Sequence, residues 1–147
     1  MPPSTRSRVP ENTADSVNAE IERQIEERVR YYAGHPKKIA RRMRELDEEW
    51  DIERAIEANA AAIGFSGIVL GATVDRRWLT LPALVTAFLF QHAVQGWCPP
   101  VPVLRRLGFR TAHEIERERN ALKALRGDYA DVSKAYDPAG AALDATA

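Results

Sequence analysis

Two stretches of the chain contain no charged residue, and they dominate its hydrophobic pattern. They cover residues 58–74 and 78–104, and only the linker Asp75-Arg76-Arg77 separates them. A soluble helical protein of this size normally carries charge along one face of every helix. As helices, residues 58–74 would rise about 25 Å and residues 78–97 about 30 Å, close to the thickness of a bilayer's hydrocarbon core. The pattern therefore predicts two transmembrane helices.

The three-residue linker is too short for anything except a tight turn, so the two helices are expected to run antiparallel. Trp78 and Trp97 stand at the two ends of the second helix, and indole side chains favour the membrane interface. Lys and Arg number six in residues 37–56, five in residues 102–119 and two in the turn. Because basic residues stay on the cytoplasmic side, both termini are predicted to be cytoplasmic in a multi-pass membrane protein. A buried helical hairpin in a soluble core is the alternative.

Apolar residues at helical spacing predict further helices at about 16–33 and 36–49, on either side of Gly34-His35-Pro36. A charged helix is expected at 112–126, ending at Gly127. The fold class predicted is all-α: an integral membrane helical hairpin with amphipathic N-terminal helices and a C-terminal helix. The predicted segments are a disordered tail (1–15), cytoplasmic amphipathic helices (16–56), a two-helix transmembrane hairpin (57–100), a cytoplasmic helical segment (101–127) and a disordered tail (128–147).

Composition narrows the function classes. The 21 basic and 21 acidic side chains balance, and the Arg pairs lack interleaved exposed aromatic residues, so no nucleic-acid partner is expected. Cys98 is the single cysteine, which excludes an intramolecular disulfide and a cysteine-based zinc site. The sequence has no glycine-rich phosphate loop, nucleophile elbow or metal-spaced His/Glu cluster. We therefore expect no enzyme activity, no metal and no cofactor.

The first apolar stretch carries small residues at a four-residue spacing. Gly67 and Gly71 form one such pair, and Ala60 and Gly64 form another. Small residues let helix backbones approach closely, which drives helix association in lipid. The groove could join two chains or pack against the second helix of its own chain. We therefore predict a homo-oligomer. The other predicted partners are the lipid bilayer and an unidentified protein.

Polar side chains interrupt the second apolar stretch at Gln91, His92 and Gln95. A turn centred on residue 76 would set Asn59 opposite position 93, so we expect Asn59 to meet His92 and Gln95. Polar groups inside a membrane are costly unless they are paired, and ionisable ones there are functional candidates. These side chains are interpreted as hydrogen-bonding contacts between helices. A proton or metal role for His92 would need further ligands.

Cys98 is followed directly by Pro99 and Pro100. A cysteine before proline can ligate haem or accept a sulfane sulfur, so Cys98 and His92 are the candidate cofactor-binding residues. The alternative is a purely structural thiol.

The stretch from Trp50-Asp51-Ile52-Glu53-Arg54 to Gly96-Trp97-Cys98-Pro99 resembles the YgaP-like inner-membrane domain family of bacteria, over about 50 of the 147 residues. Members of that family are two-helix hairpins with an amphipathic entry ending in Arg, a Gly-rich first span and a Gly-x-Cys-Pro exit. In some members the hairpin anchors and dimerises a rhodanese sulfurtransferase domain. This chain has no α/β stretch of that size. The resemblance therefore implies the fold, the membrane and dimerisation, and not sulfur transfer.

The function predicted from these patterns is that of a non-enzymatic inner-membrane hairpin protein that mediates self-association or recruits a partner. One alternative is a small redox, sulfur or haem-handling membrane protein using Cys98 and His92. A second alternative is a soluble helical interaction protein.

Overall fold

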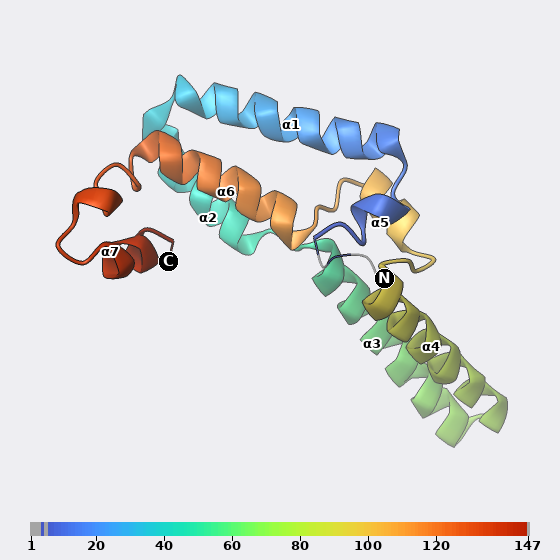
Figure 1. Cartoon of the computed structure of the whole chain (residues 1–147). Helices are drawn as coiled ribbons and strands as arrows, with labels where there is room; N and C mark the ends of the chain where they lie inside the picture. Colours follow the sequence, from blue (N-terminus) through green and yellow to red (C-terminus); the bar gives the residue numbers. More distant parts are fainter. Residues whose placement is uncertain (1–3, 5, 147) are drawn as a thin grey trace. The chain divides into compact units, whose positions relative to one another are not determined.

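The structure, a computed structural model, describes residue 4 and residues 6–146, and all regular secondary structure in these residues is helical (Figure 1). The predicted all-α class is confirmed. The helices, with 3-10 helices written η, are η1 (Pro10–Asn12), α1 (Asp15–Ala33), η2 (Pro36–Lys38), α2 (Ile39–Glu48), α3 (Ile52–Thr73), η3 (Arg76–Leu79), α4 (Thr80–Gln95), α5 (Val101–Arg106), α6 (Ala112–Arg126), η4 (Val132–Lys134) and α7 (Pro138–Thr146).

The chain divides into two compact units. The hairpin unit combines the described residues up to Ala19 with Trp50–Ala112, and the charged unit combines Glu20–Glu49 with the described residues from His113 onward. The boundaries predicted for the helices at 16–33 and 112–126 agree with α1 and α6 to within one residue.

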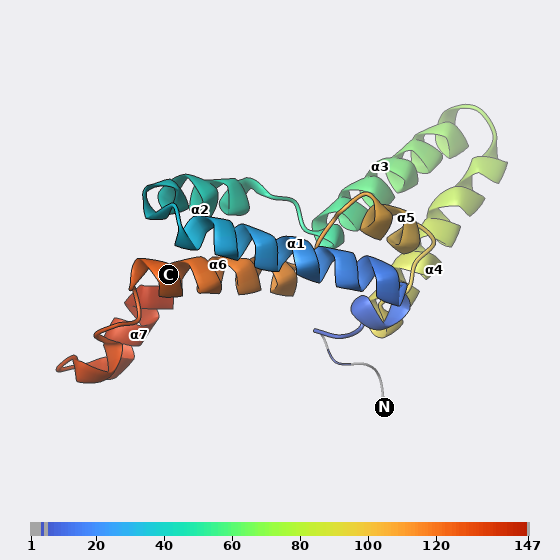
Figure 2. The same ribbon diagram turned by 90° about the horizontal axis from the view of Figure 1, so that it is seen from above.

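Helix α3 begins at Ile52 because two acceptors satisfy its first backbone N–H groups. The Asp51 carboxylate accepts from the backbone N–H of Arg54 at 2.7 Å, and the N–H of Ile52 donates to the Arg110 carbonyl at 2.8 Å. At the other end the chain reverses at Asp75, whose carboxylate accepts from the N–H of Arg77 and opens η3. Helix α4 follows η3 directly, and α3 and α4 lie side by side in both views of the fold (Figures 1 and 2).

Within the described residues, one helix is long and apolar enough to cross a membrane, judged by length and composition alone. This helix ends at Thr73 and includes the first predicted span except for its last residue, Val74. The second predicted span forms a shorter α-helix than expected, because its first residues belong to the 3-10 helix η3. The 16 residues of α4 rise about 24 Å as an α-helix.

Gly67 and Gly71 are buried where α3 meets η3 and α4. A Cβ atom at Gly67 would lie 2.6 Å from Cδ of Pro82, and one at Gly71 would lie 2.6 Å from a methyl carbon of Leu79. Gly64 faces open space, with nothing within 4 Å of its would-be Cβ. Of the two uses proposed for the groove, packing within one chain is therefore the one that occupies Gly67 and Gly71.

The predicted register of the hairpin is wrong by about one helical turn. A turn centred on residue 76 would set Gly67 opposite residue 85, whereas Gly67 contacts Leu81 and Pro82. Part of the reason is η3, because a 3-10 helix rises about 2.0 Å per residue and an α-helix about 1.5 Å. Fewer residues of the second arm are then needed to reach the same depth.

The charged unit is held by an apolar cluster that α1, α2 and α6 share. Its buried members are Tyr32, Ile39, Leu46, Ile115 and Leu122, and Met43 packs against them. In this cluster α1 and α2 cover Ile115 and Leu122 of α6, whereas Leu125 of the same helix is exposed.

A fully buried carboxylate lies inside the charged unit. The Glu118 side chain of α6 is fully buried, and its carboxylate pairs with Nε of Arg42 at 2.8 Å and with Arg28 at 3.2 Å. A buried carboxylate is tolerated only when it is paired in this way. The pairing fixes the position of α6 against α1 and α2.

The prediction of two disordered tails is wrong for most of their length. Residues 6–15 contain η1 and the start of α1, and Val9 is 1% exposed because it packs in the core of the hairpin unit. Residues 128–146 contain η4 and α7. The polar composition of the first 15 residues predicted disorder, but the buried side chain of Val9 anchors this segment in the core. Residues 1–3, 5 and 147 lie outside the described residues.

The packing at the glycines predicts how substitutions affect the hairpin. Gly67→Ala should destabilise it by about 1–3 kcal/mol, because Pro82 and the helix backbones would have to move. The measurement is the free energy of unfolding in mixed detergent micelles. Gly64→Ala is the matched control on the same helix, and it should be neutral or slightly stabilising. Equal effects of the two substitutions would contradict the packing described.

Candidate functional site

The foot of the hairpin, where α3 begins and α4 ends, is built around a small apolar core. Its buried members come from the N-terminal segment, from α3 and from the α4–α5 region: Val9, Ile52, Ile56, Cys98 and Val101. Phe88, Leu89, Leu104 and Phe109 pack against it. This core joins three segments that are far apart in sequence.

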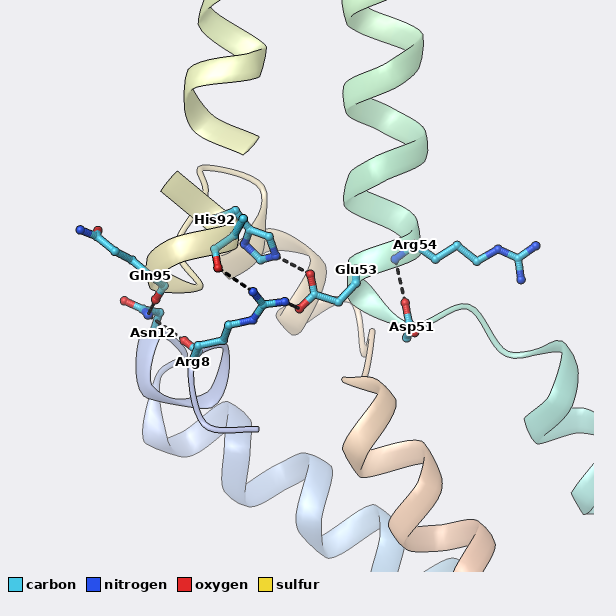
Figure 3. A network of polar contacts seen from close by, with 8 residues as sticks. Arg8, Asn12, Asp51, Glu53, Arg54, His92 and Gln95 are labelled. Carbon is cyan, nitrogen blue, oxygen red and sulfur yellow. Dashed lines mark hydrogen bonds and ion pairs between the residues drawn. The ribbon is translucent and has the colours of Figure 1, made fainter. Parts of the chain in front are cut away.

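A polar network lies at the same place (Figure 3). The Nε2 atom of His92 donates to Oε2 of Glu53 at 2.6 Å, and Nη2 of Arg8 donates to Oε1 at 2.9 Å. The Glu53 carboxylate thus receives one hydrogen bond on each oxygen. The His92 side chain is only 4% exposed, whereas those of Arg8 and Glu53 are partly exposed. Hydrogen bonds to a charged group are stronger than neutral ones, so this network ties α3, α4 and the N-terminal segment together.

The N-terminal segment also satisfies the end of α4. The last carbonyl groups of a helix have no partner within the helix. Nη1 of Arg8 donates to the Ala93 carbonyl and Nδ2 of Asn12 donates to the Gln95 carbonyl, both at 2.8 Å. Side chains from outside the helix therefore provide part of its C-terminal cap.

Gly96 makes this contact possible. It ends α4 with φ of 76°, a left-handed conformation that favours glycine. The backbone of Arg8 approaches so closely that a Cβ at Gly96 would lie 2.3 Å from the Arg8 carbonyl oxygen. Glycine is required here both for its conformation and for its lack of a side chain.

The predicted meeting of Asn59, His92 and Gln95 is wrong. Asn59 donates to the carbonyl of Ala55 on its own helix at 2.7 Å, and the partner of His92 is Glu53. Gln95 takes part through its main-chain carbonyl, and Gln91 is half-buried on α4. The physical reason is the register shift, which brings the start of α3 level with His92.

The network perturbs the ionisation of Glu53, which precedes the charge-free stretch of α3. The hydrogen bond from His92 is the largest effect that lowers the pKa of the Glu53 carboxyl; burial opposes it, and the charges of His92 and Arg8 add to the lowering. Nδ1 of His92 is buried and has no hydrogen-bond partner in the described part of the chain. The lowered pKa favours the charged form of the Glu53 carboxylate.

Cys98 lies in different surroundings. It belongs to the apolar core and lines a pocket of about 440 Å³ between α3, α4 and α5. Burial raises the pKa of its thiol, and the protonated thiol is a weaker nucleophile and metal ligand than the thiolate. Cys98 and His92 therefore have separate environments, the first apolar and the second ionic.

Among residues 4 and 6–146, no group of three or more His, Cys, Asp or Glu side chains could hold a metal ion. Comparisons with family models, with curated proteins and with solved structures found no match to this chain. The resemblance to YgaP-like domains consequently stays a prediction.

Sequence reasoning missed Glu53, Arg8 and Asn12. Glu53 closes a run of acidic residues that reads as a solvated helix face, and only the true register places it beside His92. Arg8 and Asn12 fall in a polar segment without periodicity. A hint was available for Arg8 and Asn12 in Val9, an isolated apolar residue between them.

The close approach at Gly96 can be tested with a matched pair of glycines. Gly96 and Gly108 both have positive φ, but only Gly96 is near other atoms. Gly96→Ala should therefore destabilise the hairpin unit more than Gly108→Ala, and it should expose residues 6–12 to proteolysis and amide hydrogen exchange. If both variants leave the N-terminal segment equally protected, the docking of Arg8 against Gly96 is refuted.

The lowered pKa of Glu53 predicts a pH dependence. A carboxyl group with a depressed pKa stabilises the folded state above its unfolded pKa, near 4.3, and this contribution is lost as pH falls through the folded value. Glu53→Gln should be on the order of 1–3 kcal/mol less stable than wild type at pH 7, with the difference shrinking below about pH 4. Denaturant unfolding at several pH values measures both curves, and parallel curves would argue against the network. Glu57→Gln, an exposed change one turn along α3, is the control.

Proposed function

We propose that this chain is a non-enzymatic hairpin protein of the bacterial inner membrane that uses its charged unit for self-association or to recruit a partner. In this proposal α3 crosses the bilayer through residues 58–74, and η3 with α4 returns through residues 78–97. The observation that carries it is the exposed apolar surface of the hairpin. The side chains of Phe65 and Phe90 are 70% and 71% exposed, and large apolar residues beside them are exposed as well.

The second crossing is supported by the helical length of its arm. Within this span, Trp78 and Leu79 of η3 add about 4 Å and the 16 residues of α4 about 24 Å, which together come close to a hydrocarbon core of about 30 Å. The backbone N–H and C=O groups of the arm remain bonded through the junction, since the N–H of Thr80 bonds to the Arg77 carbonyl. A spanning segment needs this continuity in lipid.

The soluble alternative would leave this apolar surface in water. Soluble monomers rarely expose contiguous apolar patches of more than a few hundred Å². The helix that ends at Thr73 is also mostly exposed along its most apolar stretch, whereas the core helix of a soluble protein is mostly buried. A bilayer accounts for both observations.

The redox, sulfur or haem alternative requires a reactive Cys98 or an available His92. The raised pKa of the buried thiol disfavours the thiolate, and Nε2 of His92 is taken by Glu53. No specific observation favours this alternative over an anchor.

Orientation follows from the basic residues. The excess of Lys and Arg before α3 and after α4, compared with two in the turn, supports a cytoplasmic position for both termini and the charged unit. Recruitment would then fall to the charged unit, whose surface carries many ionisable side chains. The resemblance to YgaP-like hairpins, some of which anchor and dimerise an attached domain, agrees with this role.

Membrane extraction tests the proposal. The wild-type protein should stay in the membrane pellet after an alkaline carbonate wash and be released by detergent. Phe65→Lys with Phe90→Lys should weaken insertion, because each lysine at the centre of a span costs about 2.5–3.5 kcal/mol. Tyr136→Lys, which changes a fully exposed aromatic residue of the charged unit, should behave as wild type.

Release of the wild-type protein by carbonate alone would overturn the proposal. Labelling of single cysteines in intact cells, in a Cys98→Ser background, adds the orientation. Position 76 should react with an impermeant maleimide and positions 20 and 130 should not. Reaction at 20 or 130 would contradict the cytoplasmic placement of the termini.

A further inference from the structure

The pocket at the foot of the hairpin has walls from three helices. Ile63 of α3, Phe88 of α4 and Val103 of α5 line it, and Cys98 belongs to its wall. Its volume of about 440 Å³ lies within the range of small-molecule sites, about 300–1,000 Å³. A protein partner would need a much larger surface, about 800 Å² on each side.

The lining specifies the chemistry of an occupant. None of the lining residues is charged, and the side-chain amide in the lining belongs to Asn59. The amide N–H of Asn59 already donates to the Ala55 carbonyl. An occupant therefore meets almost only hydrocarbon and sulfur, and a charged or strongly polar ligand would lose hydration without compensation.

The position of the pocket identifies the source of the occupant. Its wall shares Ile56 and Cys98 with the buried core, and its rim includes Ile63 and Val103, which are exposed. Ile63 precedes the exposed Phe65 by two residues on α3, and the exposed apolar residues of this helix face lipid in the proposed function. The charged residues Glu53 and Arg54, at the start of α3, precede Ile56, which is the first residue of α3 that lines the pocket.

We propose that this pocket binds one acyl chain of a phospholipid from the cytoplasmic leaflet. The inference depends on the proposed membrane insertion. Bulk lipid is as apolar as the pocket, so the hydrophobic effect does not favour the pocket over the bilayer. The chain is held by dispersion contacts with fixed helix walls, and the bound lipid should therefore be retained when detergent removes the bulk bilayer.

Native mass spectrometry of the detergent-purified full chain tests this site, with phosphatidylethanolamine and phosphatidylglycerol bilayers as the lipid source. Wild type should carry one phospholipid per chain. Ala60→Trp places an indole in the pocket and should reduce the lipid-bound fraction at least tenfold. Ala62→Trp is the matched control, because residues two apart on a helix differ by about 200° and Ala62 is exposed. The control should keep the lipid.

A second pair of variants tests the same site if Ala60→Trp fails to fold. Val103→Trp fills the pocket from α5, and Leu107→Trp changes an exposed residue at the end of the same helix. Both should retain wild-type helical circular dichroism, but only Val103→Trp should lose the lipid. Absence of a retained lipid in wild type, or equal retention in all variants, would overturn the site.

These outcomes are separate from those of the anchor itself. A protein that resists carbonate but retains no lipid would disprove the acyl-chain site and leave the anchor intact. A protein released by carbonate would disprove the anchor, and with it the premise of the site.

Discussion

The structure depends on how polar groups are satisfied where two apolar helices end. A helix leaves its last carbonyl groups without partners in the helix, and α4 ends beside a buried apolar core. Arg8 and Asn12 supply donors to Ala93 and Gln95, and the other guanidinium nitrogen of Arg8 reaches Glu53. This solution requires a close backbone approach, which Gly96 alone permits. The N-terminal segment is thereby part of the hairpin and not a tail.

The same contacts explain why an ionisable pair can lie next to a charge-free stretch. Glu53 and His92 would be costly if each were buried alone. Their short hydrogen bond and the contribution of Arg8 keep the carboxylate charged, and the partial exposure of Glu53 reduces its desolvation. The charged unit meets the same problem at Glu118, where two arginines surround a fully buried carboxylate. In both units a paired carboxylate links the helices that pack together, α3 with α4 at Glu53 and α6 with α1 and α2 at Glu118.

Sequence reasoning predicted the helices better than the contacts between them. The charge-free runs and the periodicity at 16–33 and 112–126 gave the elements, because apolar spacing is a local property. The register between α3 and α4 depends on the turn that joins them, and the sequence pattern did not predict the 3-10 helix η3 there. The two helices are therefore shifted by about one turn from the predicted register, and His92 bonds to Glu53 instead of Asn59. The contacts of Arg8 arise only when α4 ends beside it, and the isolated apolar residue Val9 was the one local hint that this segment packs. Cys98 was identified as a candidate, but its burial and its place in a pocket are tertiary properties.

The glycines of the hairpin also restrict how two chains could associate. Gly67 and Gly71 are already used against Pro82 and Leu79 of the same chain, so a second chain cannot approach α3 there without separating the hairpin. Gly64 is open, and it lies next to the exposed Phe65. Close helix packing in lipid needs a small residue beside side chains that make good dispersion contacts. If two copies of α3 pack against each other, the face around Gly64 is open to such a contact, whereas the Gly67–Gly71 face is already occupied within the hairpin.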